Sequence, residues 1–348
     1  MTESAALPPI DALLIVSFGG PEGRDEVIPF LENVLRGRNV PRERMLQVAE
    51  HYYHFGGVSP INRQCRELIA AVEEEFRRCG IGLPVYWGNR NWHPLLPDTV
   101  ARMAREGIRH AAAFVTSAFG SYSGCRQYLE NIDQARAAVG SDAPRITKLR
   151  PFFNHPEFVR AWTDRLASVL SERPLGHDAR VVFTAHSIPL PMARTSPYVD
   201  QLTETARLVA EACGVPSDRW DLVYQSRSGR PQDPWLEPDI LDHLRTLHEQ
   251  GVGRVIVVPV GFLSDHMEVL YDLDVEAQEL AGRLGMAFDR VPTVHGHPGL
   301  ARTVRRLVEE QLYGTPPESV GRLPAAATWC DPACCPPLRR RPATPNRH

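Results

Sequence analysis

The chain has 348 residues, of which 43% are hydrophobic and 23% are charged, and its formal net charge is −3 at pH 7. These are ordinary globular values, and the small negative charge gives no electrostatic reason to expect a nucleic acid as partner. The first ten residues lack Lys, Arg and a long apolar stretch, and no run reaches the roughly 18 apolar residues that a membrane-spanning helix needs. We therefore expect a cytoplasmic protein without a transmembrane segment, whose seven cysteines are reduced thiols or metal ligands rather than disulfides.

Short β-branched segments alternate with longer amphipathic segments along the chain, a pattern typical of parallel sheets built from β-α-β units. The fold class is therefore predicted to be α/β. The predicted strands are 12–18, 84–88, 111–117, 181–185, 222–225 and 254–259. The predicted helices are 60–78, 98–106, 125–139, 155–170, 198–213, 237–249 and 267–283.

The predicted elements divide the chain into two halves with a similar order. A strand-like piece at 148–153 meets Pro151, and a new helix begins after it, so we place one half at 1–150 and the other at 151–314. No internal sequence repeat is visible. After Gly314 the chain is rich in Pro and Ala and ends in a basic run, which indicates a mobile tail at 315–348.

Two glycine-bearing segments lie near the beginning of the chain. The segment 17–23 follows the first predicted strand but lacks the Gly-x-Gly-x-x-Gly spacing of a phosphate-binding turn. Its glycines are expected to let a flat ligand or another backbone come close, and the same holds for 54–62. Within the second segment, Ser59 either caps the helix predicted to begin at Pro60 or helps that helix start to receive an anionic group.

His186 follows a predicted strand and precedes a loop bounded by Pro189. An imidazole with an ordinary pKa of about 6.5 takes up and releases protons at cellular pH, so His186 is a candidate for proton transfer. The alternative is a hydrogen-bonded residue without a chemical role. The neighbouring Ser187 does not indicate a serine hydrolase, because adjacent residues of an extended chain point to opposite faces and no Gly-x-Ser-x-Gly turn occurs.

Three carboxylates, Glu268, Asp272 and Glu276, follow one another at intervals of four residues with no Lys or Arg between them. Like charges four apart on a helix repel by roughly 0.2–0.5 kcal/mol per pair. A π-type widening of the helix would bring all three into line, and such bulges are frequent at functional sites. The row follows an apolar strand, at the edge where α/β sheets place their ligands. It is either a divalent-cation site or an acidic, solvated helix face.

The tail contains Cys330, Cys334 and Cys335 within six residues. Clustered thiols next to prolines are typical of an iron–sulfur or zinc site, and a fourth ligand would then come from the body of the protein. Cys125, near a predicted loop-to-helix junction, is the candidate. The alternative is an unstructured tail that contains cysteines.

Taken together, five motifs in this order and spacing resemble the ferrochelatase family over nearly the whole chain. The actinobacterial members, held to use coproporphyrin III, are the most similar. The resemblance implies two Rossmann-like domains with a porphyrin cleft between them, and insertion of Fe²⁺ as the reaction. The motifs are Ser17-Phe18-Gly19-Gly20-Pro21, Phe55-Gly56-Gly57-Val58-Ser59-Pro60-Ile61-Asn62, Ala185-His186-Ser187-Ile188-Pro189, Gln225-Ser226-Arg227 with Pro234-Trp235-Leu236, and Ser264-Asp265-His266-Met267-Glu268.

The resemblance also implies roles for single residues. His186 would accept a proton or bind the metal at the porphyrin centre, Glu268 would lie opposite, and Asp272 and Glu276 would relay metal or protons. Imidazole and carboxylate both suit Fe²⁺. The residues implied in substrate binding are Ser59, Tyr128, Arg36, Arg90, Phe18 and Trp235.

Phe18 occupies the place where some coproporphyrin enzymes have a tyrosine that ligates the iron. Since phenylalanine cannot coordinate, His186 is the candidate ligand for product iron. Some members of the family hold a [2Fe-2S] cluster with three carboxy-terminal cysteines and one internal cysteine, which here would be Cys330, Cys334, Cys335 and Cys125.

We therefore expect a coproporphyrin III ferrochelatase, a lyase of heme biosynthesis that acts as a monomer. Within enzymes, the alternatives are a protoporphyrin IX ferrochelatase or a cobalt chelatase. From a different class, a non-catalytic tetrapyrrole or metal carrier would keep the two-lobed form without needing His186 as a base.

Overall fold

The structure is a computed structural model that describes residues 9–37, 40–230, 232–329, 331 and 334–337. It contains two four-stranded sheets that lie side by side, and every strand pair in them is parallel. The strand orders are β2-β1-β3-β4 and β6-β5-β7-β8, so the same order occurs twice. The strands are β1 (Ala12–Ser17), β2 (Val85–Asn89), β3 (His110–Val115), β4 (Arg145–Lys148), β5 (Ala179–His186), β6 (Trp220–Gln225), β7 (Arg254–Val258) and β8 (Ala287–Arg290).

Helices cover both faces of the first sheet. Leu13 and Ile15 of β1 pack with Phe76 of α3 on one face, while Leu14 and Val16 pack with side chains of α4 and α5 on the other. Alternate residues of a buried strand thus belong to different cores, as the two-residue period requires. The elements of this half are η1 (Arg24–Glu26), α1 (Val27–Val34), α2 (Arg42–His54), α3 (Ile61–Cys79), α4 (Leu96–Arg105), the π-helix η2 (Tyr122–Arg126) and α5 (Gln127–Val139).

The second sheet is covered in the same way. Phe183 of β5 packs with Trp162 of α6 and Leu202 of α8, whereas Val182 packs with α9 and with Leu273 of η3. The elements are α6 (Pro156–Glu172), α7 (Leu190–Arg194), α8 (Tyr198–Ala212), α9 (Ile240–Glu249), α10 (Met267–Val269), the π-helix η3 (Leu270–Ala277), α11 (Gln278–Arg283) and α12 (Pro298–Tyr313).

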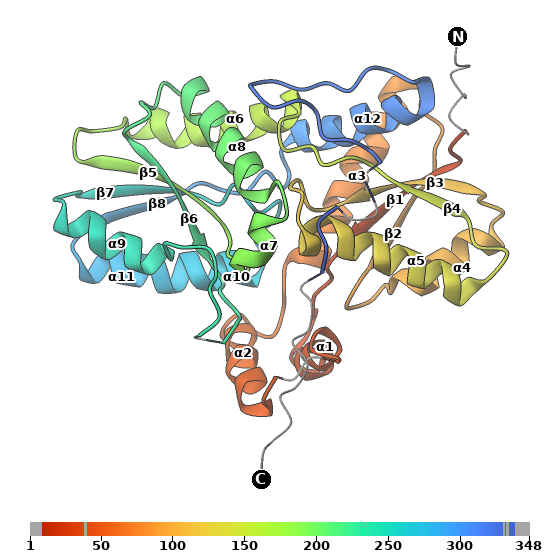
Figure 1. Ribbon diagram of the computed structural model, residues 1–348, viewed down its shortest axis with the longest axis horizontal. Helices are drawn as coiled ribbons and strands as arrows, with labels where there is room; N and C mark the ends of the chain where they lie inside the picture. The colour runs from red at the N-terminus through yellow and green to blue at the C-terminus, as the bar shows by residue number, and fades with distance from the viewer. Residues whose placement is uncertain (1–8, 38–39, 231, 330, 332–333, 338–348) are drawn as a thin grey trace.

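Two features join the halves. The largest hydrophobic core is continuous from Leu13 and Phe76 to Phe183 and Val258. In addition, α12, from the carboxy-terminal part of the chain, packs against both α3 and α6 (Figure 1). Helices α1 and α2 lie apart from both sheets and share a small core of their own around Phe30.

The six predicted strands and the seven predicted helices occur with small shifts of their ends. The prediction missed β8, α1, α2, α7 and α12, and the strand near 148–153 lies earlier, at Arg145–Lys148. The predicted helix 267–283 is present with a π-helix of eight residues in its middle, which contains Asp272 and Glu276, so a widening of the kind considered for the acidic row occurs there.

The segment that follows α12 differs from the expected mobile tail. Val320 donates a backbone hydrogen bond to Asn154 O, and Asn154 Nδ2 donates to Leu323 O at 2.7 Å. Arg322 N donates to the carboxylate of Glu204. These contacts hold part of the Pro- and Ala-rich segment against the second half, since they satisfy buried polar groups of Asn154 and Glu204.

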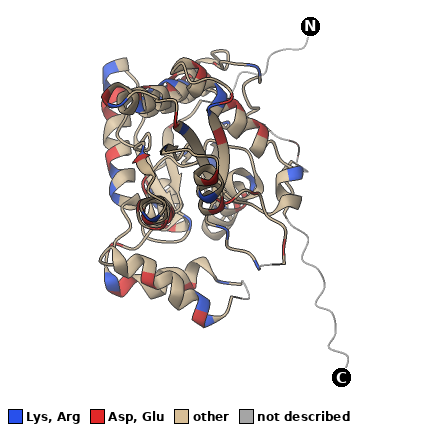
Figure 2. Ribbon diagram, turned by 90° about the vertical axis from the view of Figure 1, so that its left-hand side faces the viewer, with Lys and Arg blue, Asp and Glu red and all other residues tan. Residues whose placement is uncertain are grey.

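Acidic and basic residues are mixed along the helices, as expected for a chain of small net charge (Figure 2). Among the described residues, no helix is both long and apolar enough to cross a lipid bilayer.

Candidate active site

His186 and Glu268 form a close pair at the carboxyl ends of β5 and β7. The imidazole Nε2 of His186 lies 3.4 Å from Glu268 Oε1. His186 is the last residue of β5, and Glu268 lies in α10, which follows the loop after β7. Because β5 and β7 are neighbours in a parallel sheet, their carboxyl ends present these side chains at the same edge. The structure thus brings together the two residues that the sequence placed 82 positions apart in the chain (268 − 186 = 82).

The orientation of the His186 ring is fixed by its neighbours. Its Nδ1 contacts the backbone oxygen of Ser187, and Tyr198 Oη donates a hydrogen bond to His186 O at 3.0 Å. A proton on Nδ1 satisfies the Ser187 oxygen and directs Nε2 toward Glu268. Such an arrangement sets which ring nitrogen is free for chemistry.

The pair sets its own protonation states. Burial lowers the pKa of His186, but attraction and hydrogen bonding by Glu268 outweigh it and raise that pKa to about 9. Burial raises the pKa of Glu268, whereas His186 and His266 lower it to about 2. At neutral pH, imidazolium and carboxylate therefore face each other, because each charge stabilises the other.

Glu268 is held by groups from two further elements. Its backbone N–H donates to His266 Nδ1 at 3.3 Å, so His266 caps the start of α10. Gln225 at the end of β6 donates from Nε2 to Glu268 O at 2.6 Å. The strand end and the helix start thus fix the backbone of Glu268, although its side chain stays 47% exposed and accessible to a substrate.

Asp272 lies one step further along the row, within the π-helix. Its carboxylate accepts a hydrogen bond from Ser226 Oγ. Ser226 has φ of 60°, a left-handed conformation that costs a residue with a Cβ some energy and is frequent at functional sites. Burial raises the pKa of Asp272 to about 7, and repulsion from Glu268 and Glu276 acts in the same direction. Asp272 thus exchanges a proton readily near neutral pH.

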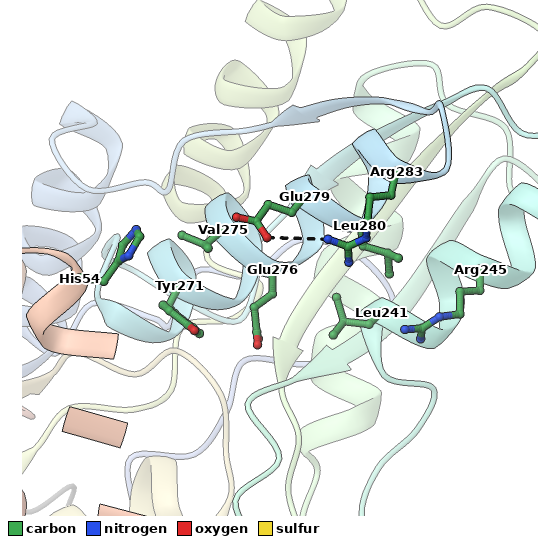
Figure 3. A pocket seen from close by; sticks show the side chains of 9 residues that line it. All are labelled: His54, Leu241, Arg245, Tyr271, Val275, Glu276, Glu279, Leu280 and Arg283. Atoms are coloured by element: carbon green, nitrogen blue, oxygen red, sulfur yellow. Dashed lines mark ion pairs between the residues drawn. The ribbon is translucent and has the colours of Figure 1, made fainter. Parts of the chain in front are cut away.

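Glu276 lines a pocket on the outer side of η3 together with Tyr271, His54 and Arg245 (Figure 3). His51 of α2 stacks on Tyr271 at a centroid separation of 3.7 Å and an angle of 9°. Helix α2 of the first half therefore contacts the π-helix of the second half. Burial raises the pKa of Glu276, and the charges of Asp239 and Glu279 add to the effect.

The predicted metal set is only partly assembled. Within the described parts of the chain, no group of three or more His, Cys, Asp and Glu side chains is arranged to hold a metal ion. His186 and Glu268 are in contact, while Asp272 and Glu276 continue along η3. A four-residue metal set stays a prediction.

Three of the residues expected to bind substrate lie together. The Arg90 guanidinium lies 4.6 Å from the ring centroid of Tyr128 and 5.7 Å from that of Phe18. Arg90 Nε is buried without a hydrogen-bond partner among the residues described. Phe18 is one of the exposed large hydrophobic residues, so an apolar ring and a cation lie next to each other.

Ser59 does not cap α3, whose N-cap residue is Pro60. Its backbone N–H donates to Pro21 O at 2.8 Å, and a Cβ added to Gly20 would lie 2.7 Å from Ser59 Cβ. The two glycine-bearing segments therefore pack directly against each other, which is the close approach expected of them. Ser59 also lines a second pocket with Arg63 and Arg66, which reaches Leu270 at the start of η3.

Trp235 and Arg36 lie in different surroundings. Trp235 forms an isolated β-bridge with Pro189, in the loop that follows His186, and its Nε1 is buried without a hydrogen-bond partner in the described structure. Arg36 is exposed, just beyond the end of α1. Roles of these residues in substrate binding stay predictions.

The cysteines expected to hold a cluster are described in part. Cys125 is buried in η2, and Cys334 Sγ lies 3.5 Å from Cys335 Sγ. Cys330 lies outside the described residues. Since the described thiols do not form a metal-binding group, no chemical step is assigned to a cluster.

Several residues that contact the site had no role predicted from the sequence. Ser226 and Gln225 lay in a quoted motif, but nothing in the sequence showed that they contact Asp272 and Glu268. Tyr198 and His51 carried no signal, because their contacts join elements that are distant along the chain.

Comparisons with known proteins identify a family for this chain. The sequence model of the ferrochelatase family matches residues 10–312. A protein of Nocardia farcinica named coproporphyrin III ferrochelatase is 52% identical over 97% of this chain and 99% of its own length. A Rhodopirellula baltica protein named ferrochelatase is 51% identical over 97% of this chain and 96% of its own length.

Solved structures of chelatases share the fold. SirB from Bacillus subtilis, solved with Fe³⁺, superposes with a TM-score of 0.52 at 16% identity, over 87% of this chain and 96% of its own. At that identity the likeness concerns the fold alone. The family match and the relatives of about half-identical sequence, which cover nearly the whole chain, show that this protein belongs to the ferrochelatase family.

Proposed function

We propose that this protein is a coproporphyrin III ferrochelatase, which inserts Fe²⁺ into the macrocycle with release of two pyrrole protons. The observation that carries the proposal is the contact between His186 and Glu268 at the shared sheet edge. Relatives from Nocardia farcinica and Mycolicibacterium smegmatis, each 52% identical, are named coproporphyrin III ferrochelatase. These names support the choice of porphyrin.

The chemistry requires a proton acceptor and a group that receives the metal at the same place. A ferrous ion that reaches Glu268 competes with the imidazolium of His186 for the carboxylate, and so lowers the proton affinity of the ring. The ring then releases its own proton to solvent, and neutral His186 accepts a pyrrole proton or ligates the metal through Nε2. Fe²⁺ accepts both imidazole and carboxylate ligands.

Asp272 suits the onward transfer of protons. Its pKa of about 7 means that it is partly protonated at neutral pH, next to Glu268 in the row. A group with a pKa near the working pH accepts and releases a proton at a similar cost. In this proposal Asp272 and Glu276 transfer protons away from Glu268 along η3, or metal ions toward it.

The Phe18, Arg90 and Tyr128 cluster supplies contacts for the substrate. The exposed ring of Phe18 offers apolar surface to a macrocycle, while the Arg90 guanidinium, which lies between Phe18 and the buried ring of Tyr128, suits a propionate. Coproporphyrin III has four propionates, so several donors are needed, and Ser59 and Arg36 are the further candidates.

We also propose that Cys330, Cys334, Cys335 and Cys125 hold a [2Fe-2S] cluster. The spacing of the three carboxy-terminal thiols and the short Cys334–Cys335 separation support it. Protein prepared anaerobically should contain iron and sulfide and absorb visible light, and C334S should bleach that absorbance. Colourless wild-type protein without iron and sulfide would exclude the cluster.

The function is tested by turnover. Anaerobic protein is mixed with Fe²⁺ and either coproporphyrin III or protoporphyrin IX, and the metalloporphyrin absorbance is followed. We expect faster insertion into coproporphyrin III. Faster insertion into protoporphyrin IX would reverse the substrate assignment. Tight porphyrin binding without metallation of either would make the protein a carrier, and turnover with Co²⁺ alone would make it a cobalt chelatase.

A further inference from the structure

Arg290 is the last residue of the edge strand β8 and makes ion pairs in two directions. Its Nη1 lies 2.7 Å from Asp265 Oδ1, while Nε and Nη2 donate to the two carboxylate oxygens of Asp274 at 2.5 and 3.0 Å. The contact with Asp274 is a two-pronged one, which fixes direction as well as distance. One guanidinium therefore joins two points of the chain that are nine residues apart (274 − 265 = 9).

These two points enclose the reactive segment. Asp265 immediately precedes His266, which caps α10, and Glu268 follows three residues after Asp265. Asp274 lies in η3, between Asp272 and Glu276. Arg290 thus holds both ends of the stretch that carries Glu268 and Asp272.

Asp265 is fixed by two further contacts. Thr293 Oγ1 donates to Asp265 Oδ2 at 3.1 Å. The backbone N–H of Asp265 donates to Gln64 Oε1 at 3.0 Å, and Gln64 belongs to α3 of the first half of the chain. Asp265, at the amino-terminal end of the stretch that Arg290 holds, is therefore also hydrogen-bonded to α3, which covers the first sheet.

The ion pairs are shielded from water. The side chains of Arg290, Asp265 and Asp274 are only 18%, 19% and 27% exposed. Ion pairs in such surroundings are screened less than those on the surface, and they restrict the groups they join. Among the described residues, none of the three side chains makes a hydrogen bond or ion pair with His186 or Glu268, so an effect on chemistry is indirect.

We propose that Arg290 is a positioning residue for metal insertion, which holds the 266–273 stretch so that Glu268 faces His186 and Asp272 continues the row. The proposal rests on the proposed function, because it concerns how that site is kept in shape. Misplacing a reacting group by about 1 Å costs on the order of a hundredfold in rate, so loss of the ion pairs should act on turnover.

The experiment compares R290Q and R290K with R180Q and R180K. Arg180 is a matched control, because it makes a similar two-pronged pair with Asp221 at 2.7 and 2.8 Å, with exposures of 23% and 25%, on β5 of the same sheet. That pair lies near the amino end of the strand, away from His186. Steady-state turnover with coproporphyrin III is measured for each variant.

We expect R290Q to lower kcat about tenfold or more relative to R180Q, with KM for porphyrin within about twofold, because the substrate contacts are unchanged. R290K should recover part of the loss, since it restores the charge but not the two-pronged geometry. Equal kcat values for R290Q and R180Q would overturn the proposal.

A second readout does not depend on activity. Backbone hydrogen exchange of residues 266–273 should be faster in R290Q than in R180Q and wild type. If R290Q does not fold, the test uses D274N, which removes one end of the contact and should show the same faster exchange. Unchanged exchange in D274N would also contradict the proposal. If the wild type inserts no metal but R290Q shows the faster exchange, the proposed function fails while the positioning role stands.

Discussion

At the scale of single residues, the chemistry of the site depends on how two side chains change each other's protonation. The pKa of His186 is raised to about 9 and that of Glu268 is lowered to about 2, although burial alone would move both in the opposite directions. The folded chain thus holds an imidazolium and a carboxylate at neutral pH. A base that is already protonated needs the arrival of the metal before it accepts a pyrrole proton.

Replacing His186 by Ala should abolish metal insertion and leave porphyrin binding largely intact. The substitution removes the imidazole that lies 3.4 Å from Glu268 Oε1, whereas the Phe18, Arg90 and Tyr128 cluster is untouched. Turnover measures metal insertion, and fluorescence quenching measures porphyrin binding. H243A is the matched control, since His243 of α9 pairs with Asp221 of β6 at 3.2 Å. Near-wild-type turnover of H186A would remove its assigned role.

The substitution E268Q should lower the pKa of His186 from about 9 toward or below its ordinary 6.5, because burial then acts without the opposing carboxylate. A raised histidine pKa stabilises the folded state fully below 6.5, and this contribution is lost as pH rises through about 9. In E268Q this contribution, and its loss as pH rises from 6.5 to about 9, should therefore be absent. NMR titration of the His186 ring measures the shift, with D221N as control. A pKa that stays near 9 in E268Q would contradict the assigned cause.

At the scale of secondary structure elements, a π-helix, a residue in a left-handed conformation and the end of an edge strand place the site. The π-helix η3 contains Asp272 and Glu276, which follow Glu268 in the row, and Ser226, directly after β6, donates a hydrogen bond to Asp272. The edge strand β8 ends at Arg290, which contacts both sides of the row. None of these features could be derived from helix or strand periodicity alone.

Helix α12 joins the two halves through a buried ion pair. Arg150, which follows β4, is paired with Glu310 of α12 at 2.8 Å, and the side chains are 1% and 6% exposed. Replacing Glu310 by Ala leaves the guanidinium buried without its charge partner, which should lower the free energy of unfolding by about 3–5 kcal/mol.

Urea unfolding measures this cost. E279A is the control, because the Glu279–Arg283 pair is 66% exposed on both sides and should be worth no more than about 1 kcal/mol. Equal losses in E310A and E279A would show that the buried pair does not join α12 to the body of the protein.

At the scale of the whole molecule, the continuous core makes the two halves depend on each other. Hydrophobic residues of both sheets and of α3, α6, α8 and α12 belong to one cluster. Ion pairs cross the same boundary, such as Arg305–Glu75 at 2.9 Å and His295–Glu67 at 2.7 Å. The division at residue 150 stays a prediction about the arrangement of domains, as does the monomeric state.

We expect a single cooperative unfolding transition for the whole chain, because neither half can expose its share of that core alone without losing apolar burial. Tryptophan fluorescence and far-ultraviolet circular dichroism followed in the same urea series should give coincident curves. Two separated transitions would show that 1–150 and 151–314 unfold as independent domains.

Much of the fold followed from local patterns. The segments Ala12–Ser17 and Arg254–Val258 form strands that are buried on both faces of their sheets. A strand buried on both faces consists largely of consecutive apolar residues, so both strands could be predicted from the sequence. The edge strand β8, by contrast, is only partly buried and contains Asp289 and Arg290, so it lacks that pattern. Helices α1 and α2 were missed because they pack on each other around Phe30 rather than on a sheet.

The sequence by itself determined the α/β class, because the class depends on the periodicity of apolar residues. It also determined the family and the candidate reactive side chains of His186, Glu268 and Asp272, because these depend on motifs that are contiguous in the chain. Only the tertiary structure decided that Glu268 faces His186, that Ser226 reaches Asp272, and that Arg290 and Gln64 hold the intervening stretch. Those contacts join residues far apart in sequence. Their distances depend on how parallel strands align at one edge and on how α3 packs across the boundary, which no local pattern records.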